Sequence, residues 1–277
     1  MPTPDKTRVL EEWLPTTDLS VTIIAYNCRS LLQACLASVY HKIPPVAFEV
    51  IGVDNRSVDG TADMVQQAFP QVLLIENPVN RGVARARNQA IRKARGRYIL
   101  ILDADTEIIS ENFQSLLDYM DDNPGIGILG CGLTSGDGRL HPSARSFPRP
   151  LHILLRRLLL WGVIKKSRTL DEHHLASWDR KIPQEVDFVE GAFQLVRREA
   201  ILKVGLLDEK MFYGFEDADY CARMKKAGYS VVWYPAFFVR HHLQGMTRKR
   251  PLSRLACSHA KSYLRFYVKH LLFSRDA

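Results

Sequence analysis

Two aspartates separated by one residue, Asp103-Ala104-Asp105, directly follow the apolar run Tyr98–Leu102. Carboxylate oxygens are the ligands that Mg²⁺ prefers, and a metal there could hold a diphosphate. Two acids beside a loop are often only solvated. A buried strand that leads into two charges favours a functional role, because charge at the end of an apolar run is costly without a partner.

A basic segment, Asn80–Asn88, lies shortly before that run and reads Asn-Arg-Gly-Val-Ala-Arg-Ala-Arg-Asn. The N-terminus of a helix attracts anions, and cationic side chains there suit a pyrophosphate. Arg87 is the stronger candidate for a phosphate contact, whereas Arg81 and Arg85 are also explained as surface charge. No P-loop lysine occurs. The acidic pair, as a metal site, and the basic segment, as a phosphate site, together predict an enzyme that uses a nucleoside diphosphate donor.

Polar side chains also follow two earlier apolar runs. Asp54 ends one of them and is a candidate for contact with a nucleobase, and Asn27 ends the other. The next residues, Asp59–Thr61, are more typical of a turn and a helix cap than of a ligand site.

Three acids, Glu216, Asp217 and Asp219, open a predicted helix. Acids at a helix N-terminus are favourable without any function. The functional alternative is a general base, because the aromatic residues at 212, 213 and 215 could desolvate a carboxylate and raise its pKa. Further on, His241-His242 could complete a metal site, although a histidine pair on a surface is usually without function.

The elements that position these residues alternate along the first half of the chain. Strands are predicted over 19–25, 48–53, 71–76 and 98–102, with helices over 31–39, 60–69 and 82–94 and one capped by Ser110. This alternation predicts βαβ units and a parallel sheet, whose ligands lie at the carboxyl ends of the strands. Asn27, Asp54, Asp103 and Asp105 should therefore face one crevice.

The pattern weakens after Gly136. Strands are predicted over 186–196 and 231–234, the latter ending before Pro235, and short helices over 198–204 and 216–227. The apolar stretch 147–164 with interspersed arginines suits either a membrane interface or a core helix or oligomer surface. An amphipathic helix with a basic side is predicted over 252–273.

Composition sets broader limits. The chain has 277 residues and a net charge of +8, with 46% hydrophobic and 25% charged residues, which is ordinary for a globular α/β protein. Its basic excess suits nucleic acid, anionic lipid or a phosphorylated substrate without choosing among them. Five scattered cysteines without Cys-x-x-Cys spacing argue against structural zinc and for a reducing cytoplasm. Neither a signal core nor a spanning helix is expected.

Taken in order, these segments resemble an inverting glycosyltransferase of family 2, in its rhamnosyltransferase-like branch, over roughly Leu19 to Thr247. The resemblance implies the GT-A fold: a Rossmann-like nucleotide-binding half, a mixed and mainly parallel sheet with helices on both faces, an acceptor-binding half and a C-terminal amphipathic helix. The motifs that carry it are Val21–Asn27, Val53–Thr61, Asn80–Asn88, Leu102–Thr106, Gly191–Arg198 with Val204–Asp208, and Phe215–Arg223.

The resemblance also implies roles for single residues. Asp217, or with less support Glu216, would be the catalytic base. Asp105 and Asp103 would hold Mg²⁺ or Mn²⁺ together with His242, with His241 as the alternative. The nucleotide sugar would contact Asn27, Asp54, Asn55, Arg81, Gly82, Arg87, Asp103, Ala104, Asp105 and Gly191.

The implied organisation is an N-terminal tail (1–18), a catalytic domain (19–247) with a donor half (19–133) and an acceptor half (134–247), and a basic helix (248–277). The implied partners are a UDP- or dTDP-linked sugar and a glycan or lipid-linked acceptor. Peripheral contact with an anionic membrane, at the inner face of the cell membrane, is a further expectation; no nucleic acid is expected, and the oligomeric state is open.

Two other classes of protein fit less well. A non-catalytic module that binds nucleic acid or an anionic surface would explain the basic charge but not the ordered acids at strand ends. A nucleotidyltransferase would need a Gly-rich loop with a lysine near the N-terminus, which the sequence lacks.

Overall fold

The computed structural model describes residues 15–43, 46–160, 163, 165–175, 178–242 and 253–272, so most of the expected N-terminal tail and the segment Gly245–Thr247 lie outside the described residues. The first half alternates as predicted, with strands and helices of the expected type in the expected order. The strands are β1 (Thr17–Ala25), β2 (Phe48–Asp54), β3 (Leu73–Glu76) and β4 (Gly96–Asp103), and the helices are α2 (Arg29–Lys42), α3 (Thr61–Ala68) and α4 (Val83–Lys93).

The second half contains shorter and less regular elements. Its strands are β5 (Thr106–Ile108), β6 (Ile126–Thr134), β7 (Leu140–His141), β8 (Ala144–Arg145), β9 (Gln184–Glu185), β10 (Phe188–Val189), β11 (Phe193–Arg197) and β12 (Ser230–His241). Its helices are α5 (Gln114–Asp122), α6 (Pro150–Leu160), α7 (Arg168–His173), α8 (Arg198–Val204), α9 (Glu216–Lys226), α11 (Arg254–Tyr267) and the π-helix η1 (Val268–Leu272).

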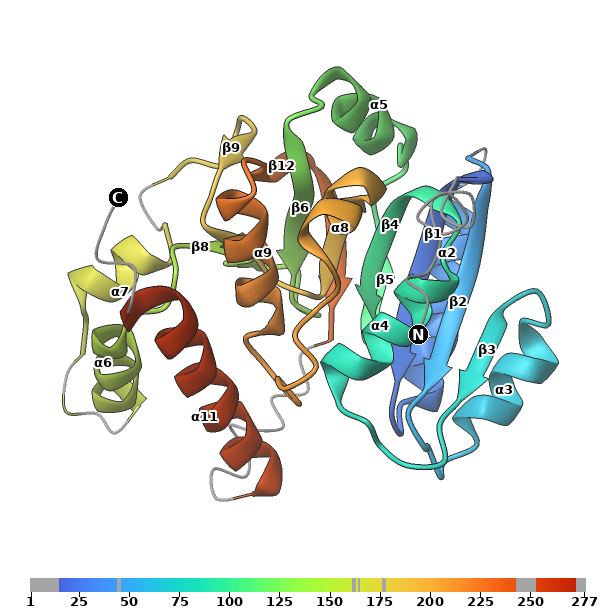
Figure 1. The fold of residues 1–277 in the computed structure, drawn as a ribbon, viewed down its shortest axis with the longest axis horizontal. Helices are drawn as coiled ribbons and strands as arrows, with labels where there is room; N and C mark the ends of the chain where they lie inside the picture. The colour runs from blue at the N-terminus through green and yellow to red at the C-terminus, as the bar shows by residue number, and fades with distance from the viewer. Residues whose placement is uncertain are drawn as a thin grey trace, which may run out of the picture.

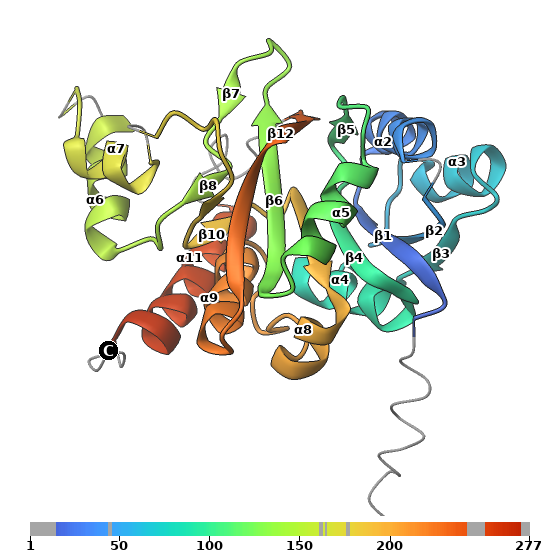
Figure 2. The ribbon, with the colours of Figure 1, turned by 90° about the horizontal axis from the view of Figure 1, so that it is seen from above.

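One mixed sheet of ten strands organises the molecule, in the order β3-β2-β1-β4-β11-β6-β12-β5 with β7 on β6 and β9 on β12 (Figure 1). The strands from β3 to β4 are parallel, and β11 is antiparallel to both of its neighbours. Helices α2, α3 and α5 pack on one face of the sheet, and α4, α8 and α9 pack on the other. Beyond β12, α6, α7 and α11 gather at the end of the molecule farthest from β3 (Figures 1 and 2).

Alternation along β4 explains why the sheet is covered on both faces. Tyr98, Leu100 and Leu102 join the core under α2 and α5, while Ile99 and Ile101 join the core under α4 and α8. Successive strand residues point to opposite faces, so a continuous apolar run is the pattern of a strand buried on both sides.

Three expectations for single elements were wrong. The strand expected over 186–196 is interrupted between β10 and β11, and Gly191 lies in the turn. The strand expected to end before Pro235 continues as β12 to His241, since a register shift between Tyr234 and Phe238 accommodates the proline. Ser110 does not cap α5, because its Oγ accepts a hydrogen bond from the Phe238 amide (2.8 Å).

Charged contacts tie the C-terminal helices to the body of the protein. The Asp208 carboxylate pairs with Arg265 (2.8 Å), and the buried carboxylate of Asp219 on α9 pairs with His270 (2.7 Å) and Lys269 (2.6 Å). Asp219, the third acid of the predicted cluster, thus has a structural partner set. Among the helices in the described ranges, none combines the length and the apolar character needed to span a bilayer.

Candidate active site

The carboxyl ends of β1, β2 and β4 meet at one edge of the sheet. The parallel register sets Asp54 opposite Ala25 and Asp103 opposite Ile24, so the two acids flank the end of β1. A cavity of about 530 Å³ opens at this edge and reaches the first turn of α9. Its walls include Asp103, Asp105 and Asp217, so the acids of both halves face one space.

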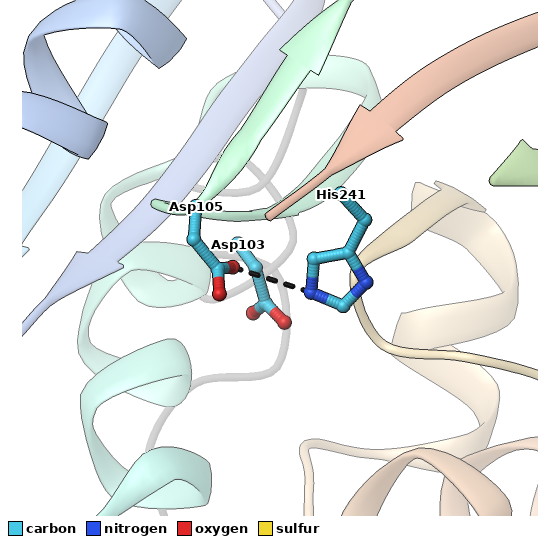
Figure 3. Close-up of side chains that lie close together, drawn as sticks. All are labelled: Asp103, Asp105 and His241. Atoms are coloured by element: carbon cyan, nitrogen blue, oxygen red, sulfur yellow. Dashed lines mark ion pairs between the residues drawn. The ribbon is translucent and has the colours of Figure 1, made fainter. Parts of the chain in front are cut away.

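Asp103, Asp105 and His241 lie close together on the wall of this cavity. One ligand atom from each lies within 4.8 Å of the others, and Asp105 Oδ1 is 3.3 Å from His241 Nε2 (Figure 3). The antiparallel pairing of β12 with β5 places His241 opposite Thr106, next to Asp105. Two carboxylates and an imidazole suit a divalent cation, so the residues present fit such an ion.

His242 lies away from this group. Its Nε2 is 2.5 Å from Glu107 Oε1, and its main-chain N–H donates to the Asp105 carbonyl (2.8 Å). Neighbouring residues at a strand end point to opposite sides, so only one of the two histidines can face the aspartates. The structure therefore places His241, the alternative histidine, next to Asp103 and Asp105. His242, the histidine that the sequence favoured, is not part of this group.

The charges at this group influence one another. Burial raises the pKa of Asp103, and Arg87 only partly offsets this. Burial lowers the pKa of His241, but the carboxylates of Asp105, Asp103 and Glu190 together outweigh it, so the net direction is upward. His241 Nδ1 is buried without a hydrogen-bond partner. A cation would relieve the repulsion between the two aspartates.

Arg87 connects the metal-site acids to α9. Its Nη2 donates to Asp103 Oδ1 (2.6 Å) and to the Gly191 carbonyl (2.8 Å), while its Nη1 donates to Glu216 Oε1 (3.1 Å). Its side chain is only 3% exposed. Burial lowers the pKa of Arg87, but Asp103 and Glu216 raise it to a net value above its ordinary range. Both terminal nitrogens of Arg87 are thus hydrogen-bonded within the protein. This arrangement favours a role in positioning the two carboxylates over the phosphate contact that the sequence predicted.

Arg87 leaves no room for a side chain at position 191. A Cβ at position 191 would lie 2.6 Å from Arg87 Nη1, closer than real side chains approach. A side chain at position 191 would therefore displace the buried Arg87 guanidinium.

Asp217 is held by the chain that passes this break. Its Oδ2 accepts from the Gly191 N–H (3.0 Å) and its Oδ1 accepts from the Ala218 N–H (2.8 Å). Burial raises the pKa of Asp217 despite these two bonds. Phe215, at φ 65°, forms a strained turn directly before Glu216 and Asp217, the first two residues of α9. A carboxylate with a raised pKa that still lines the cavity is suited to accept a proton.

Glu216 is less accessible than its neighbour. It is buried, its Oε1 is paired with Arg87, and its Oε2 has no partner. Burial and the adjacent Asp217 raise the pKa of Glu216 to about 7. Of the two acids, Asp217 is thus the one whose position suits contact with a substrate.

The loop after β2 is ordered by amide side chains. Asn55 Oδ1 accepts from the Arg81 N–H (2.9 Å), and Asn55 Nδ2 donates to Asn80 Oδ1 (3.0 Å). Gly82, at φ 78°, begins α4 beneath Phe212. Asn55, Gly82 and Ala104 line the cavity, whereas Arg81 is exposed and does not.

Asp54 and Asn27 lie beside the cavity but not on its described wall. Asp54 Oδ2 accepts from the Ser57 N–H (2.9 Å) while its Oδ1 is buried without a partner, and Asn27 Oδ1 accepts from the Val58 N–H (2.8 Å). Asp59 accepts from Arg29 N and Thr61 N, at the starts of α2 and α3, as the capping interpretation expected.

Sequence reasoning missed Glu190 and its partners. Glu190 lines the cavity, pairs with Arg145 and lies 3.1 Å from His141 Nε2. Burial raises its pKa, but Arg145 and His141 outweigh that and bring the pKa of Glu190 to about 2. The signal was present: an acid in the apolar run 186–196, directly before Gly191, needs a charged partner.

Known proteins with similar sequences point to the same chemistry. The profile described as "Glycosyl transferase family 2" matches residues 20–205. The N-acetylglucosaminyl-diphospho-decaprenol L-rhamnosyltransferase of Mycobacterium tuberculosis is 29% identical over 92% of this chain and 86% of its own length. A UDP-Glc:alpha-D-GlcNAc-diphosphoundecaprenol beta-1,3-glucosyltransferase of Escherichia coli is 32% identical over 37% of this chain and 41% of its own length.

A solved structure is similar in fold. The structure of GalNAc-T7 with UDP, GalNAc and Mn²⁺ aligns with a TM-score of 0.65 at 19% identity, over 91% of this chain and 48% of that one. Since β1 to β4 also have the expected order and direction, the predicted GT-A architecture is confirmed.

Proposed function

Because this chain belongs to glycosyl transferase family 2, we propose that it moves a sugar from a UDP- or dTDP-linked donor to a hydroxyl group, with inversion at the anomeric carbon. One observation carries the proposal: the Asp103–Asp105–His241 group and the Asp217 carboxylate line the same cavity. A site for a charged leaving group thus faces a base across a space large enough for a sugar.

In this proposal each wall has one task. Asp217 accepts the proton of the acceptor hydroxyl, and the acceptor oxygen attacks the anomeric carbon opposite the leaving group. The new C–O bond forms as the bond to the diphosphate oxygen breaks, so no covalent intermediate with the protein is required. Backbone donors from Gly191 and Ala218 hold the Asp217 carboxylate in place.

We assign the cation to Asp103, Asp105 and His241. When bound, a divalent ion supplies positive charge for the departing diphosphate. Either Mg²⁺ or Mn²⁺ would serve, and the Mn²⁺ in the similar GalNAc-T7 structure supports the second. On the donor side, Asn55 and Gly82, which line the cavity, are proposed to contact the nucleoside, with Asn27 and Asp54 beside them. The 19–133 half is proposed as the donor half and the 134–247 half as the acceptor half.

For the acceptor we propose a sugar linked through a diphosphate to a polyprenol. The two relatives from Mycobacterium tuberculosis and Escherichia coli are named for acceptors of this kind. An amphiphilic acceptor also supports peripheral contact with an anionic membrane through α6 and α11. Leu151, Leu159 and Leu264 on these helices are 51%, 39% and 60% exposed, and Lys261 is exposed beside them on α11. Flotation with anionic liposomes at low salt tests this contact. A protein that stays at the bottom of the gradient would contradict the proposed membrane contact.

The experiment that tests the function is a panel of UDP-, dTDP- and GDP-sugars, each with Mn²⁺ or Mg²⁺ and with EDTA. The readout is release of free nucleoside diphosphate in the presence of a polyprenyl-diphosphate-linked sugar. We expect metal-dependent release with one UDP- or dTDP-sugar. Release that persists in EDTA would contradict the metal assignment, and no release from any donor would contradict transfer.

A further inference from the structure

We propose that the part of the cavity lined by α6, α7 and α11 binds the phosphate groups of a lipid-linked acceptor. This inference rests on the proposed function, which requires an acceptor but does not say where its charge is held. We call this region the histidine compartment, and its lining residues are Pro148, His152, Leu170, His173, His174, Leu255 and His259.

The compartment is continuous with the catalytic cavity and close to the base. His259 on α11 packs against Phe215 with ring centroids 4.9 Å apart, and Phe215 directly precedes Glu216 and Asp217. An acceptor sugar at Asp217 would therefore have its linked phosphate near His259. Figures 1 and 2 show α6, α7 and α11 on the side of the molecule away from β1, β2 and β3.

Imidazoles from α6 and from the end of α7 lie close together there. The rings of His152 and His173 lie 4.3 Å apart, and those of His173 and His174 lie 5.2 Å apart. Within the described part of the chain, no group here brings three metal-ligating atoms as close together as Asp103, Asp105 and His241 do. The histidines here therefore lack the geometry of a metal site, and an imidazole N–H can donate to an anion. His173 Nδ1 also lies 3.0 Å from Ser146 Oγ.

Hydrogen bonding fixes His152 as a donor. Its Nδ1 accepts from the Arg149 N–H (3.2 Å), so the neutral ring carries its proton on Nε2. Burial and Arg149 lower the pKa of His152, which keeps the ring neutral near pH 7. A neutral imidazole N–H is a competent donor to a phosphate oxygen, and the bond is strengthened by the charge of the acceptor group.

No negative charge in the compartment opposes an anion. None of the described lining residues on α6, α7 and α11 is acidic. The nearest lining acid in sequence, Glu190, is already paired with Arg145 and His141, so its charge is balanced. The acids that remain lie on the catalytic walls. A diphosphate would thus be separated from Asp103 and Asp105 by the length of the acceptor sugar.

The outer surface of the same helices suits the remainder of such a molecule. Leu151 and Leu159 on α6 and Leu264 on α11 are exposed. A polyprenol chain leaving the compartment could contact these apolar side chains. This combination distinguishes a lipid-linked phosphate from a second nucleotide, which would need polar contacts beyond its phosphates.

Direct binding tests the inference. The probe is farnesyl diphosphate, titrated into the full chain with UDP and Mn²⁺ at saturating concentration so that the donor site is filled. We expect His152→Ala and His173→Ala each to weaken probe binding about tenfold or more, the scale of a lost hydrogen bond to a charged group, with unchanged affinity for UDP. His152→Gln keeps an N–H donor of similar reach and should retain most of the affinity. His41→Ala, an exposed histidine on α2, is the matched control.

Two further probes separate phosphate from lipid. Farnesol should bind at least tenfold more weakly than farnesyl diphosphate, and inorganic pyrophosphate should compete with the latter. Equal binding of farnesol, or unchanged probe binding in both alanine variants that still bind UDP, would overturn the inference. Failure of the nucleotide-sugar panel is a separate result, because this titration involves no turnover.

Discussion

The two walls of the cavity are built in different ways. The donor wall consists of the ends of β1, β2 and β4, which are parallel strands joined by short helical crossovers. The opposite wall combines the start of α9, the turn between β10 and β11, and the end of β12, which come from distant parts of the chain. Asp103 is placed by its own strand, whereas Asp217 is placed by Gly191, 26 residues away.

This difference has an energetic consequence. On the donor wall the loop residues form hydrogen bonds within their own loop, as for Asp54 and Ser57, or with an adjacent loop, as for Asn55 and Asn80. On the opposite wall Glu190 is held by Arg145 and His141, and His241 by Asp105. Arg87 joins the two walls. Changes on the donor wall should therefore act locally, and changes on the opposite wall should propagate through charge pairs.

Replacing the base should have the largest effect. We expect Asp217→Asn to lower kcat by about 10²- to 10⁴-fold, because the amide cannot accept a proton. The amide oxygen can still accept from the Gly191 N–H, so affinity for UDP with Mn²⁺ should be unchanged. Steady-state kinetics and titration of UDP measure the two quantities. Asp118→Asn, an exposed acid on α5, is the control, and normal turnover of Asp217→Asn would disprove the assignment.

Removing the bridge between the walls should cost stability. Arg87→Met leaves the carboxylates of Asp103 and Glu216 without their partner, and we expect the free energy of unfolding to fall by about 3 kcal/mol or more. Chemical denaturation measures this change. Arg85→Met, which removes an arginine that is 56% exposed, should have little effect.

A second variant tests the reason for that loss. Adding Glu216→Gln to Arg87→Met removes one of the two unpaired charges and should recover part of the lost stability. If the double variant were as unstable as the sum of the single variants, the unpaired charge of Glu216 would not be the cause.

The two histidines give a matched pair on one strand. Second-shell changes at metal sites typically cost about 10- to 100-fold in metal affinity. Loss of a ligand should cost at least as much, so we expect His241→Ala to weaken Mn²⁺ binding by about tenfold or more. His242→Ala should change it less than about twofold, because the His242 ring is paired with Glu107. Titration of Mn²⁺ in the presence of UDP measures both, and a reversed order would restore His242 as the ligand.

The sequence predicted the donor half better than the acceptor half. In the donor half, β-branched strands, helical spacing and polar strand ends are local signals, and they predicted β1 to β4 and the facing of Asp103 and Asp105 into one cavity. Asp54 was placed beside that cavity and not on its described wall, because Ser57 turns its carboxylate into the loop. A local pattern shows where a strand ends but not where the side chain turns.

In the acceptor half the decisive contacts are long-range. Nothing near Gly191 in the sequence indicates that Arg87, 104 residues away, will occupy the space of its missing side chain. β12 continues through Pro235 because β6 supports it, and β6 was not expected at all. The choice between His241 and His242 depends on that extension. Such features follow from packing between distant segments, for which a single sequence offers few signals.

The smallest predicted effect tests the charge coupling of the acceptor wall. Burial is the main cause of the raised pKa of Asp217, and the charge of Glu190 contributes in the same direction. Since the pKa of Glu190 is about 2, this acid is ionised throughout the working range. Glu190→Gln removes this negative charge, and we therefore expect it to lower the pKa of Asp217.

The base acts only when deprotonated, so activity is lost as the pH falls through the pKa of Asp217. The acid limb of the kcat profile should therefore move to lower pH in Glu190→Gln, by less than about one pH unit, or about 1.4 kcal/mol. Glu185→Gln, an exposed acid paired with Lys225, should leave the limb unchanged. A limb that moved to higher pH would mean that Glu190 acts on the acceptor itself and not through the charge of Asp217, and the two walls would then differ less than their construction suggests.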